Sequence, residues 1–246
     1  MKPFWRYYGG KNRAAKKYPV PLLREPIIEP FAGAAGYATV HGAWREVVLV
    51  ERDPRIAAIW RWLIEATRDD VLALADLPDG ATVDDMDWPD AARDLVGFWC
   101  NDGSAKPCKS PSKWARGEGT NGIGWSGWCD RSRQRVARQV DMIRSWTVIE
   151  GDYSEAPDIR ATWFIDPPYQ TAAGRHYTYS EIDYDRLGRW CDGLQGLVIA
   201  CDQEGADWRE WNRRISVKAL PTAARNNTSK EVAWVRGEVD VFSLFS

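Results

Sequence analysis

The chain has few cysteines and no long apolar run, and both absences narrow the class of protein. It contains 5 cysteines in 246 residues, with no CxxC pair and no histidine at zinc-finger spacing. We therefore expect reduced thiols rather than a disulfide framework, and no metal site. There is no run of about 18 apolar residues and no signal-peptide pattern, so we expect a cytoplasmic protein without a membrane partner, with a monomer as the favoured state.

Charges are segregated along the chain although the net charge is only −2. Residues 65–94 hold ten acids against two bases, and residues 104–138 hold eight bases against two acids. Four of the 15 tryptophans lie within or beside the basic stretch: Trp99, Trp114, Trp125 and Trp128. Because bases stack on aromatic rings and phosphates attract basic side chains, this stretch is a candidate nucleic-acid surface. A small subdomain stabilised by tryptophan packing explains the pattern equally well.

Apolar patterning predicts an α/β fold that opens with a βαβα unit. Residues 26–30 and 46–51 have the composition of buried strands, and residues 37–43 continue the first turn as a helix. A second helix begins at Pro54 and runs to residue 64, with apolar side chains three and four positions apart. Strands and helices that alternate in this way favour a parallel sheet.

The strand pattern resumes after residue 146. We predict strands at 147–149, 161–165 and 196–201, a helix at 183–193, and antiparallel strands at 215–217, 231–235 and 239–242. The intervening residues, 70–145, form an insertion of helix and loop that includes a basic helix at 131–145. The expected fold is a Rossmann-like, doubly wound, mostly parallel sheet with antiparallel C-terminal strands. Residues 1–69 and 146–246 would form its main domain.

The segment Asp166-Pro167-Pro168-Tyr169 follows the predicted strand at 161–165. An acid at the carboxyl end of such a strand points into the crevice where open α/β sheets bind ligands. Two prolines fix the backbone and remove two N–H donors, which leaves the carbonyls of Asp166 and Pro167 as acceptors. With the aromatic face of Tyr169, these acceptors suit a planar ring that bears an exocyclic amine. The alternative is a proline-terminated strand with Asp166 as a turn residue.

Glycines and acids end the earlier strands in a pattern that favours a nucleoside. Gly33 and Gly36 follow the first strand, where a ligand approaches the backbone, and Glu51 ends the second strand, where an acid accepts from ribose hydroxyls. A complete G-x-G-x-x-G is absent, so a nucleoside without a pyrophosphate is expected. S-adenosylmethionine fits this description. The alternative for Glu51 is a solvated strand end.

Two further blocks belong to the same predicted edge of the sheet. Tyr7-Tyr8-Gly9-Gly10-Lys11 places a cation among aromatics, where it would meet a carboxylate of the cofactor or orient Asp166. Gly151-Asp152-Tyr153 follows the strand at 147–149, and Asp152 is placed to accept from an adenine amino group while Tyr153 packs on the ring.

In this order, the blocks Tyr-Gly-Gly-Lys, Glu-Pro-Phe-Ala-Gly, Glu51, Gly-Asp-Tyr and Asp-Pro-Pro-Tyr resemble the Dam-type DNA adenine-N6 methyltransferases (D12 class, alpha group). The resemblance covers residues 4–64 and 147–236, with looser likeness at 199–202 and at Lys230-Glu231-Val232. It implies a catalytic domain with an inserted target-recognition region at 70–145. The family's Phe-x-Gly-x-Gly is departed from, because Ala35 stands where the second glycine is usual, and a methyl there would alter the fit of the cofactor unless Gly36 compensates.

The resemblance implies roles for named residues. The implied S-adenosylmethionine site comprises Tyr7, Lys11, Phe31, Gly33, Ala34, Gly36, Glu51, Arg52, Asp152, Tyr153 and Asp166. The implied catalytic residues, which would hold an adenine flipped out of double-stranded DNA, are Asp166, Pro167, Pro168 and Tyr169. The insertion supplies the candidate DNA contacts Lys106, Lys109, Lys113, Arg116, Trp125, Arg131 and Arg133. Two alternatives stay open: a methyltransferase for another planar amine (cytosine N4, an RNA base or a glutamine amide), and a non-catalytic nucleic-acid-binding protein with this fold.

Overall fold

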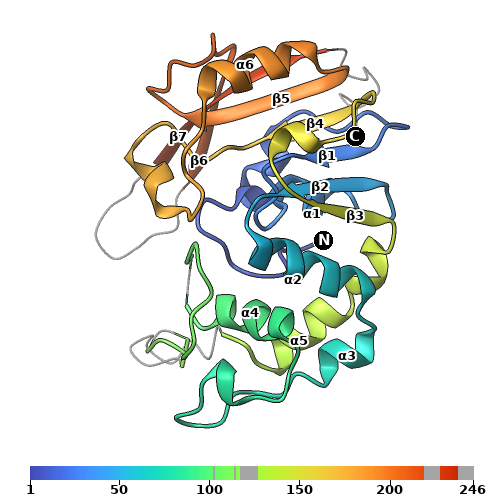
Figure 1. Ribbon diagram of the computed structural model, residues 1–246, viewed down its shortest axis with the longest axis vertical. Helices are drawn as coiled ribbons and strands as arrows, with labels where there is room; N and C mark the ends of the chain where they lie inside the picture. Colours follow the sequence, from blue (N-terminus) through green and yellow to red (C-terminus); the bar gives the residue numbers. More distant parts are fainter. Residues whose placement is uncertain (102, 114, 117–126, 219–227, 238–246) are drawn as a thin grey trace.

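The computed structural model describes residues 1–101, 103–113, 115–116, 127–218 and 228–237. Its centre is a seven-stranded sheet of order β3-β2-β1-β4-β5-β7-β6 (Figure 1). The strands are β1 (Ile27–Glu29), β2 (Val47–Glu51), β3 (Trp146–Glu150), β4 (Ala161–Ile165), β5 (Gly196–Gln203), β6 (Arg213–Lys218) and β7 (Thr228–Arg236). The first five pair with one another in parallel, and β7 is antiparallel to both β5 and β6. The predicted α/β class, with antiparallel C-terminal strands, is confirmed; the strand predicted at 239–242 lies outside the described residues.

Helices cover both faces of the sheet. On one face, α1 (Gly36–His41) and α2 (Pro54–Glu65) pack in a large hydrophobic cluster; on the other, α6 (Tyr184–Gly193) packs in a second cluster. The sequence explains why α2 begins where it does, since Pro54 occupies its first turn and the Asp53 carboxylate accepts from the Arg55 N–H at 3.0 Å. The apolar side chains spaced along this helix are buried as predicted.

The strand order reverses between β1 and β4. β1 lies between β2 and β4, with Ile28 opposite Val48 on one side and Trp163 on the other. The connections from β1 through α1 to β2 and from β4 through α6 to β5 therefore leave in opposite directions. Open α/β sheets bind ligands in the crevice at such a reversal, outside the carboxyl ends of the strands.

In its described residues the insertion contains the short α-helices α4 (Asp90–Trp99) and α5 (Asp130–Ala137), and α3 (Arg68–Leu72) leads into it (Figure 1). The prediction of one helix over 131–145 is wrong, because the chain tightens after Ala137 into a 3-10 turn, η4 (Val140–Ile143). At the break the buried Gln139 accepts from the Lys2 N–H at 2.7 Å and donates to the Lys2 carbonyl at 3.1 Å. The break also lets Val140 and Ile143 turn into the core.

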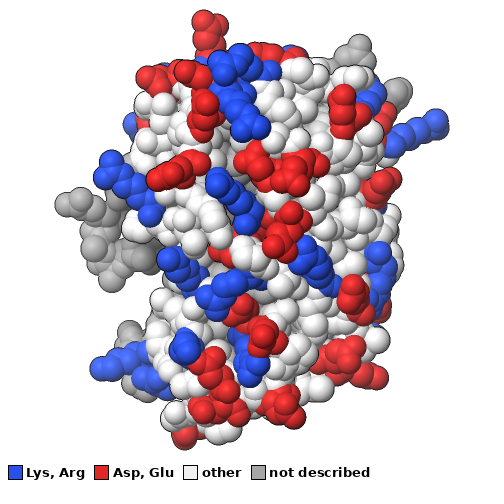
Figure 2. Space-filling view, in the orientation of Figure 1, with Lys and Arg blue, Asp and Glu red and all other residues white. Residues whose placement is uncertain are grey.

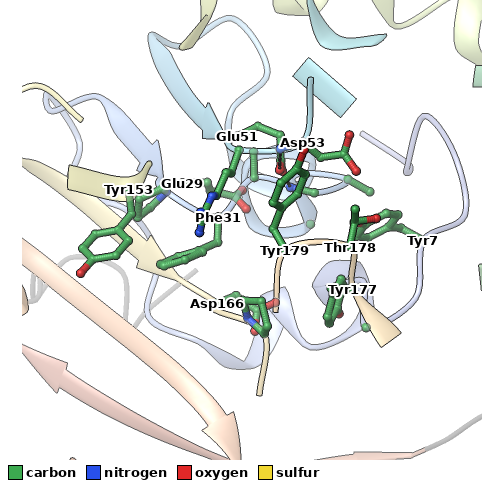
Figure 3. A pocket seen from close by; sticks show the side chains of 18 of the residues that line it. Tyr7, Glu29, Phe31, Glu51, Asp53, Tyr153, Asp166, Tyr177, Thr178 and Tyr179 are labelled. Atoms are coloured by element: carbon green, nitrogen blue, oxygen red, sulfur yellow. Dashed lines mark hydrogen bonds between the residues drawn. The ribbon is translucent and has the colours of Figure 1, made fainter. Parts of the chain in front are cut away.

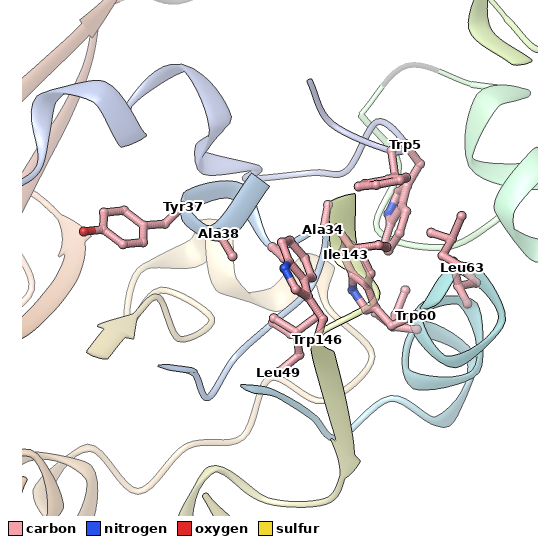
Figure 4. Close-up of a cluster of buried hydrophobic side chains, with 14 of the residues drawn as sticks. Trp5, Ala34, Tyr37, Ala38, Leu49, Trp60, Leu63, Ile143 and Trp146 are labelled. Atoms are coloured by element: carbon pink, nitrogen blue, oxygen red, sulfur yellow. The ribbon is translucent and has the colours of Figure 1, made fainter. Parts of the chain in front are cut away.

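The insertion shares its core with one face of the sheet. Trp60 makes tilted ring contacts with Trp5 and Trp146, at 4.8 Å and 5.5 Å between ring centroids (Figure 4). Trp99 and Trp128 belong to the same cluster and donate their indole N–H groups to the carbonyls of Phe4 and Leu74. For these two tryptophans the packing interpretation is therefore correct; Trp114 and Trp125 lie outside the described residues.

Short 3-10 turns position several loops around the sheet. They are η1 (Lys11–Arg13), η2 (Ala15–Lys17), η3 (Val83–Asp85), η5 (Tyr153–Glu155) and η6 (Ala172–His176). None of the helices in the described part of the chain is long and apolar enough to cross a membrane.

Candidate functional site

A cavity lies at the carboxyl ends of β1, β2 and β4, where the strand order reverses (Figure 3). Its volume is about 810 Å³ when the open mouth is included. Every residue predicted for the cofactor site lines this cavity: Tyr7, Lys11, Phe31, Gly33, Ala34, Gly36, Glu51, Arg52, Asp152, Tyr153 and Asp166. Blocks that are far apart in the sequence therefore meet at one place, as expected for strand ends of a parallel sheet.

Glu51 is a half-buried, oriented acceptor rather than a solvated strand end. One carboxylate oxygen accepts from the Gly33 N–H and the other from the Asp53 N–H, each at 2.8 Å. These bonds tie the end of β2 to the turn after β1. Burial raises the pKa of Glu51 to about 7, although both backbone donors oppose the rise. A ligand that donates hydrogen bonds to this carboxylate would favour its ionised form.

Phe31 and Tyr153 form the aromatic wall of the cavity together. Their rings stack at 5.3 Å with 30° between planes, and Tyr153 is further covered by an edge contact with Trp190. In Figure 3 the Tyr153 hydroxyl points away from the other labelled side chains, and Phe31 lies between Tyr153 and the centre. Phe31 is thus the ring that faces the cavity. Asp152 uses one oxygen to cap η5, accepting from the Ser154 hydroxyl at 2.7 Å.

Asp166 and Lys11 form a buried ion pair at the floor of the cavity. The Lys11 Nζ lies 2.8 Å from Asp166 Oδ1, and the Lys11 side chain is 4% exposed. Burial raises the pKa of Asp166, and Lys11 opposes that rise. Cys201 Sγ also lies 3.4 Å from Oδ1. No donor among the described residues meets Oδ2, which leaves that oxygen as an acceptor.

The other residues of the Asp-Pro-Pro-Tyr block divide between two neighbouring cavities. Pro168 lines the main cavity, and its carbonyl accepts from the Tyr184 hydroxyl. Pro167 is buried and is not among the lining residues. The Tyr169 ring faces Lys11, whose Nζ is 4.6 Å from the ring centroid, and Tyr169 lines an adjacent, more open cavity. Tyr169 is therefore at the boundary between the two.

The turn after β1 explains the departure at Ala35. Gly33 and Ala35 both have left-handed backbones, with φ of 45° and 46°. A Cβ on Gly33 would come within 2.9 Å of the Tyr7 ring, so glycine lets Tyr7 cover the turn. Ala35 is fully buried and does not line the cavity, so its methyl group does not alter the cavity wall. Its cost is the conformation, roughly 1 kcal/mol for a non-glycine residue.

Gly36 has a role that the sequence did not indicate. A Cβ there would lie 2.7 Å from the Lys11 N and 2.9 Å from the Asn12 N. Only glycine therefore lets η1 pack directly on the start of α1. That packing is what brings Lys11 into the cavity.

The segment after Tyr169 contributes lining residues that sequence reasoning missed: Tyr177, Thr178, Tyr179 and Ile182. The Tyr177 hydroxyl donates to the Tyr8 carbonyl at 3.1 Å and lies over Gly9, where a Cβ would come within 2.1 Å of it. Arg52 lies 5.4 Å from the centroid of the Tyr179 ring. This segment has no periodicity to analyse; the cluster of tyrosines between a proline-terminated strand and the next helix was its one signal.

Glu29, also missed, ends β1 inside the cavity wall. It is 2% exposed and its carboxylate accepts from the Ala38 N–H at the start of α1. Burial raises its pKa to about 8, and the backbone donor opposes this.

The basic stretch and the acidic stretch are partly paired in the fold. Arg133 is ion-paired with Asp76 at 2.5 Å and its side chain is only 14% exposed, and Lys109 pairs with Asp84. The charge of Arg133 is therefore paired within the insertion, and its predicted contact with DNA stays a prediction. Five predicted DNA contacts are exposed: Lys106, Lys109, Lys113, Arg116 and Arg131. Trp125 lies outside the described residues.

The surface view gives the same mixed distribution. Lys and Arg side chains gather beside the indentation at the left margin, between the sheet and the inserted helices, and acidic side chains are interspersed among them (Figure 2). No single-sign field covers this face.

No protein-family model and no curated protein matches this chain. The residues of the cavity therefore carry the functional conclusion.

Proposed function

We propose that the protein is an S-adenosylmethionine-dependent DNA methyltransferase that acts on N6 of adenine. The observation that carries the proposal is one cavity at the reversal of the strand order. It joins an oriented, ribose-type acceptor, Glu51, to a carboxylate, Asp166, that a buried lysine holds at 2.8 Å. The first binds a nucleoside and the second binds an amine.

The charges of the lining residues fit a sulfonium cofactor better than a pyrophosphate one. Besides Glu29, whose pKa burial raises to about 8, the lining acids are Glu51, Asp53, Asp152 and Asp166, against the cations Lys11 and Arg52. Lys11 is already paired with Asp166. An excess of carboxyl groups attracts a cation and repels phosphates. Glu51 would accept from ribose hydroxyls, and Phe31 would pack on the adenine of the cofactor.

Asp166 would act by positioning the target amine. When bound, S-adenosylmethionine supplies a methyl group on a positively charged sulfur. Lys11 and Cys201 fix Oδ1 of Asp166, so Oδ2 is free to accept an N6–H of the target adenine. That bond favours a pyramidal nitrogen whose lone pair points at the methyl group, and orientation of this kind lowers the barrier without a covalent enzyme intermediate. The methylated nitrogen is strongly acidic and releases its proton without a strong base.

The target base must leave the duplex to reach Asp166. A flipped adenine loses its stacking, and Tyr169, at the boundary of the two cavities, supplies a replacement ring face. The exposed bases Lys106, Lys113 and Arg131 of the insertion would contact phosphates.

The test is transfer of a labelled methyl group to unmethylated duplex DNA, single-stranded DNA, RNA and protein, followed by identification of the labelled product. We expect N6-methyldeoxyadenosine from DNA, abolished in Asp166→Ala and unchanged in the control Asp158→Ala, which removes an exposed acid. The Asp166→Ala effect should fall on kcat, with cofactor binding retained. Labelled N4-methylcytosine, RNA or glutamine would show that the substrate is another amine and not adenine in DNA. Absence of transfer to every acceptor would support a non-catalytic binder.

A further inference from the structure

A second carboxylate, Glu231, comes from the antiparallel strand β7 and lies beside Lys11, although it does not line the cavity itself. Glu231 is 8% exposed and stands opposite Gln203 of β5 and Ile215 of β6. Side chains alternate between the faces of a strand. Ala233 and Val235, two and four residues on, pack in the cluster that includes Ala15 of η2, and Glu231 lies on this side of the sheet, near Lys11.

Glu231 is held by hydrogen bonds to two tyrosines. One oxygen accepts from the Tyr18 hydroxyl at 2.8 Å, and the other accepts from the Tyr169 hydroxyl at 3.4 Å. The second oxygen also lies 3.9 Å from the Lys11 Nζ. Lys11 in turn lies against both Asp166 and the ring of Tyr169.

A buried charge persists when it is paired and hydrogen-bonded, and this one is both. Burial alone would lower the pKa of Lys11, but the surrounding carboxylates raise it well above its usual value. Lys11 therefore stays charged and binds both acids. Tyr169 is tethered at its hydroxyl while its ring stays against the ammonium group.

We infer that Glu231 is a positioning residue that fixes the Tyr169 ring and the Lys11 ammonium group, and through them the orientation of Asp166. This inference rests on the proposed function for its catalytic consequence. It adds to that function a physical link between the C-terminal β6–β7 pair and the target-amine site. Glu231 does not touch the reacting atoms; it acts through Tyr169 and Lys11.

The charge of Glu231 also sets the acidity of Asp166. The titratable groups around Asp166 come from every element packed against it: Lys11, Tyr18, Glu29, Tyr169, Tyr177, Cys201 and Glu231. Lys11 favours ionised Asp166, and the negative charge of Glu231 disfavours it. Glu231→Gln keeps the acceptor for Tyr169 and removes the charge. The pKa of Asp166 should therefore fall in that variant.

The experiment compares Glu231→Gln with Glu204→Gln. Glu204 follows β5, is 39% exposed, and pairs with Lys230 of β7 at 3.4 Å. Its substitution therefore removes a carboxylate next to the same strands without affecting the cavity. Asp166 is titrated in the ligand-free proteins by ¹³C NMR, with Asp166→Asn to assign its signal. Methyl transfer is then measured from pH 5 to 9.

In Glu231→Gln we expect a lower pKa for Asp166 and an acid limb of kcat moved to lower pH. Plateau kcat should fall by about fivefold, the difference between hydrogen bonds to a charged and to a neutral acceptor. The KM for the cofactor should be unchanged, and Glu204→Gln should match the wild type. Tyr169→Phe should lower kcat by a similar factor, and the double variant should lose less than the product of the two losses.

The inference would be overturned if Asp166 titrates in Glu231→Gln as it does in the wild type and the pH profile of kcat is also unchanged. If Glu231→Gln does not fold, Tyr18→Phe removes the other tether, and wild-type kcat in that variant would likewise overturn it. The NMR titration separates this failure from failure of the proposed function. A shifted Asp166 in a protein that transfers no methyl group would support the geometry and reject the catalytic role together with the proposed function.

Discussion

Replacement of Lys11 by methionine should destabilise the protein in a way that depends on pH. Lys11 is 4% exposed, lies 2.8 Å from Asp166 and 3.9 Å from Glu231, and donates to the Gly9 carbonyl at 3.3 Å. Methionine keeps most of its volume and removes its charge. Two buried carboxylates then share a site without a counter-ion.

The magnitude follows from breaking a buried pair on one side only. Loss of one partner of a buried ion pair costs about 3–5 kcal/mol, because the remaining charge is left uncompensated. A typical domain is stable by about 5–15 kcal/mol, so Lys11→Met should remain folded but should unfold at a much lower urea concentration. We expect a loss of about 3–5 kcal/mol at pH 8.

The sign of the pH dependence is fixed by the direction of the pKa changes. Burial already raises the pKa of Asp166, and without the opposing charge of Lys11 it should rise further above its unfolded value. Stability that is present below the unfolded value is then lost as pH rises through the folded one. The deficit of Lys11→Met relative to the wild type should therefore shrink from pH 8 to pH 5, where protonation removes the unpaired charges.

Urea unfolding at pH 5 and pH 8, followed by tryptophan fluorescence, measures both values. Lys16→Met is the control, because Lys16 is an exposed lysine in the neighbouring turn η2. The double variant Lys11→Met/Glu231→Gln should recover part of the loss. A deficit below about 1 kcal/mol at pH 8, typical of a surface pair, or an equal deficit at both pH values, would refute this reasoning.

Three further predictions concern the cavity and the insertion. Glu51→Ala should weaken S-adenosylmethionine binding by about 1.5–3 kcal/mol, and unchanged affinity would reject Glu51 as a ligand. The affinity of the wild-type protein should rise as pH rises through about 7, and calorimetry in two buffers should detect proton release on binding. Neutralising Lys106 and Lys113 should reduce the slope of log affinity for DNA against log salt by about 0.9 per phosphate contact. The control Arg24→Ala, which removes an exposed arginine ahead of β1, should leave the slope unchanged, and equal slopes in all variants would show that these lysines do not touch DNA. Since burial raises the pKa of Glu29 to about 8, its contribution to stability is lost as pH rises through that value. Thermal unfolding should therefore find Glu29→Gln more stable than the wild type above pH 8. Parallel curves of unfolding temperature against pH for the two proteins would count against a buried protonated Glu29.

The sheet could be predicted because each central strand is a short, continuous apolar run ended by a polar residue. Ile27, Val48 and Ile165 are buried on strands whose neighbours cover both faces, which is what such runs signify. The site followed from the same logic, since Phe31, Glu51 and Asp166 each follow a strand, and parallel strands end at one edge.

Contacts between distant segments could not be predicted from spacing. Tyr177 enters the site through its packing on Gly9, and Glu231 through its hydrogen bond to Tyr18, 213 positions away in the chain. Arg133 reads as a free cation in a basic stretch until the fold places Asp76 beside it. Each of these depends on which loops meet, and local sequence patterns contain no information on that.

The most direct test of the central claim is the base composition of DNA from cells that express the protein in a host without adenine methylation. Digestion to nucleosides and mass spectrometry should detect N6-methyldeoxyadenosine with the wild-type protein and none with Asp166→Ala expressed at the same level. No methylated adenine with the wild type, or equal amounts with both proteins, would contradict the assignment of this cavity and of Asp166 to adenine methylation.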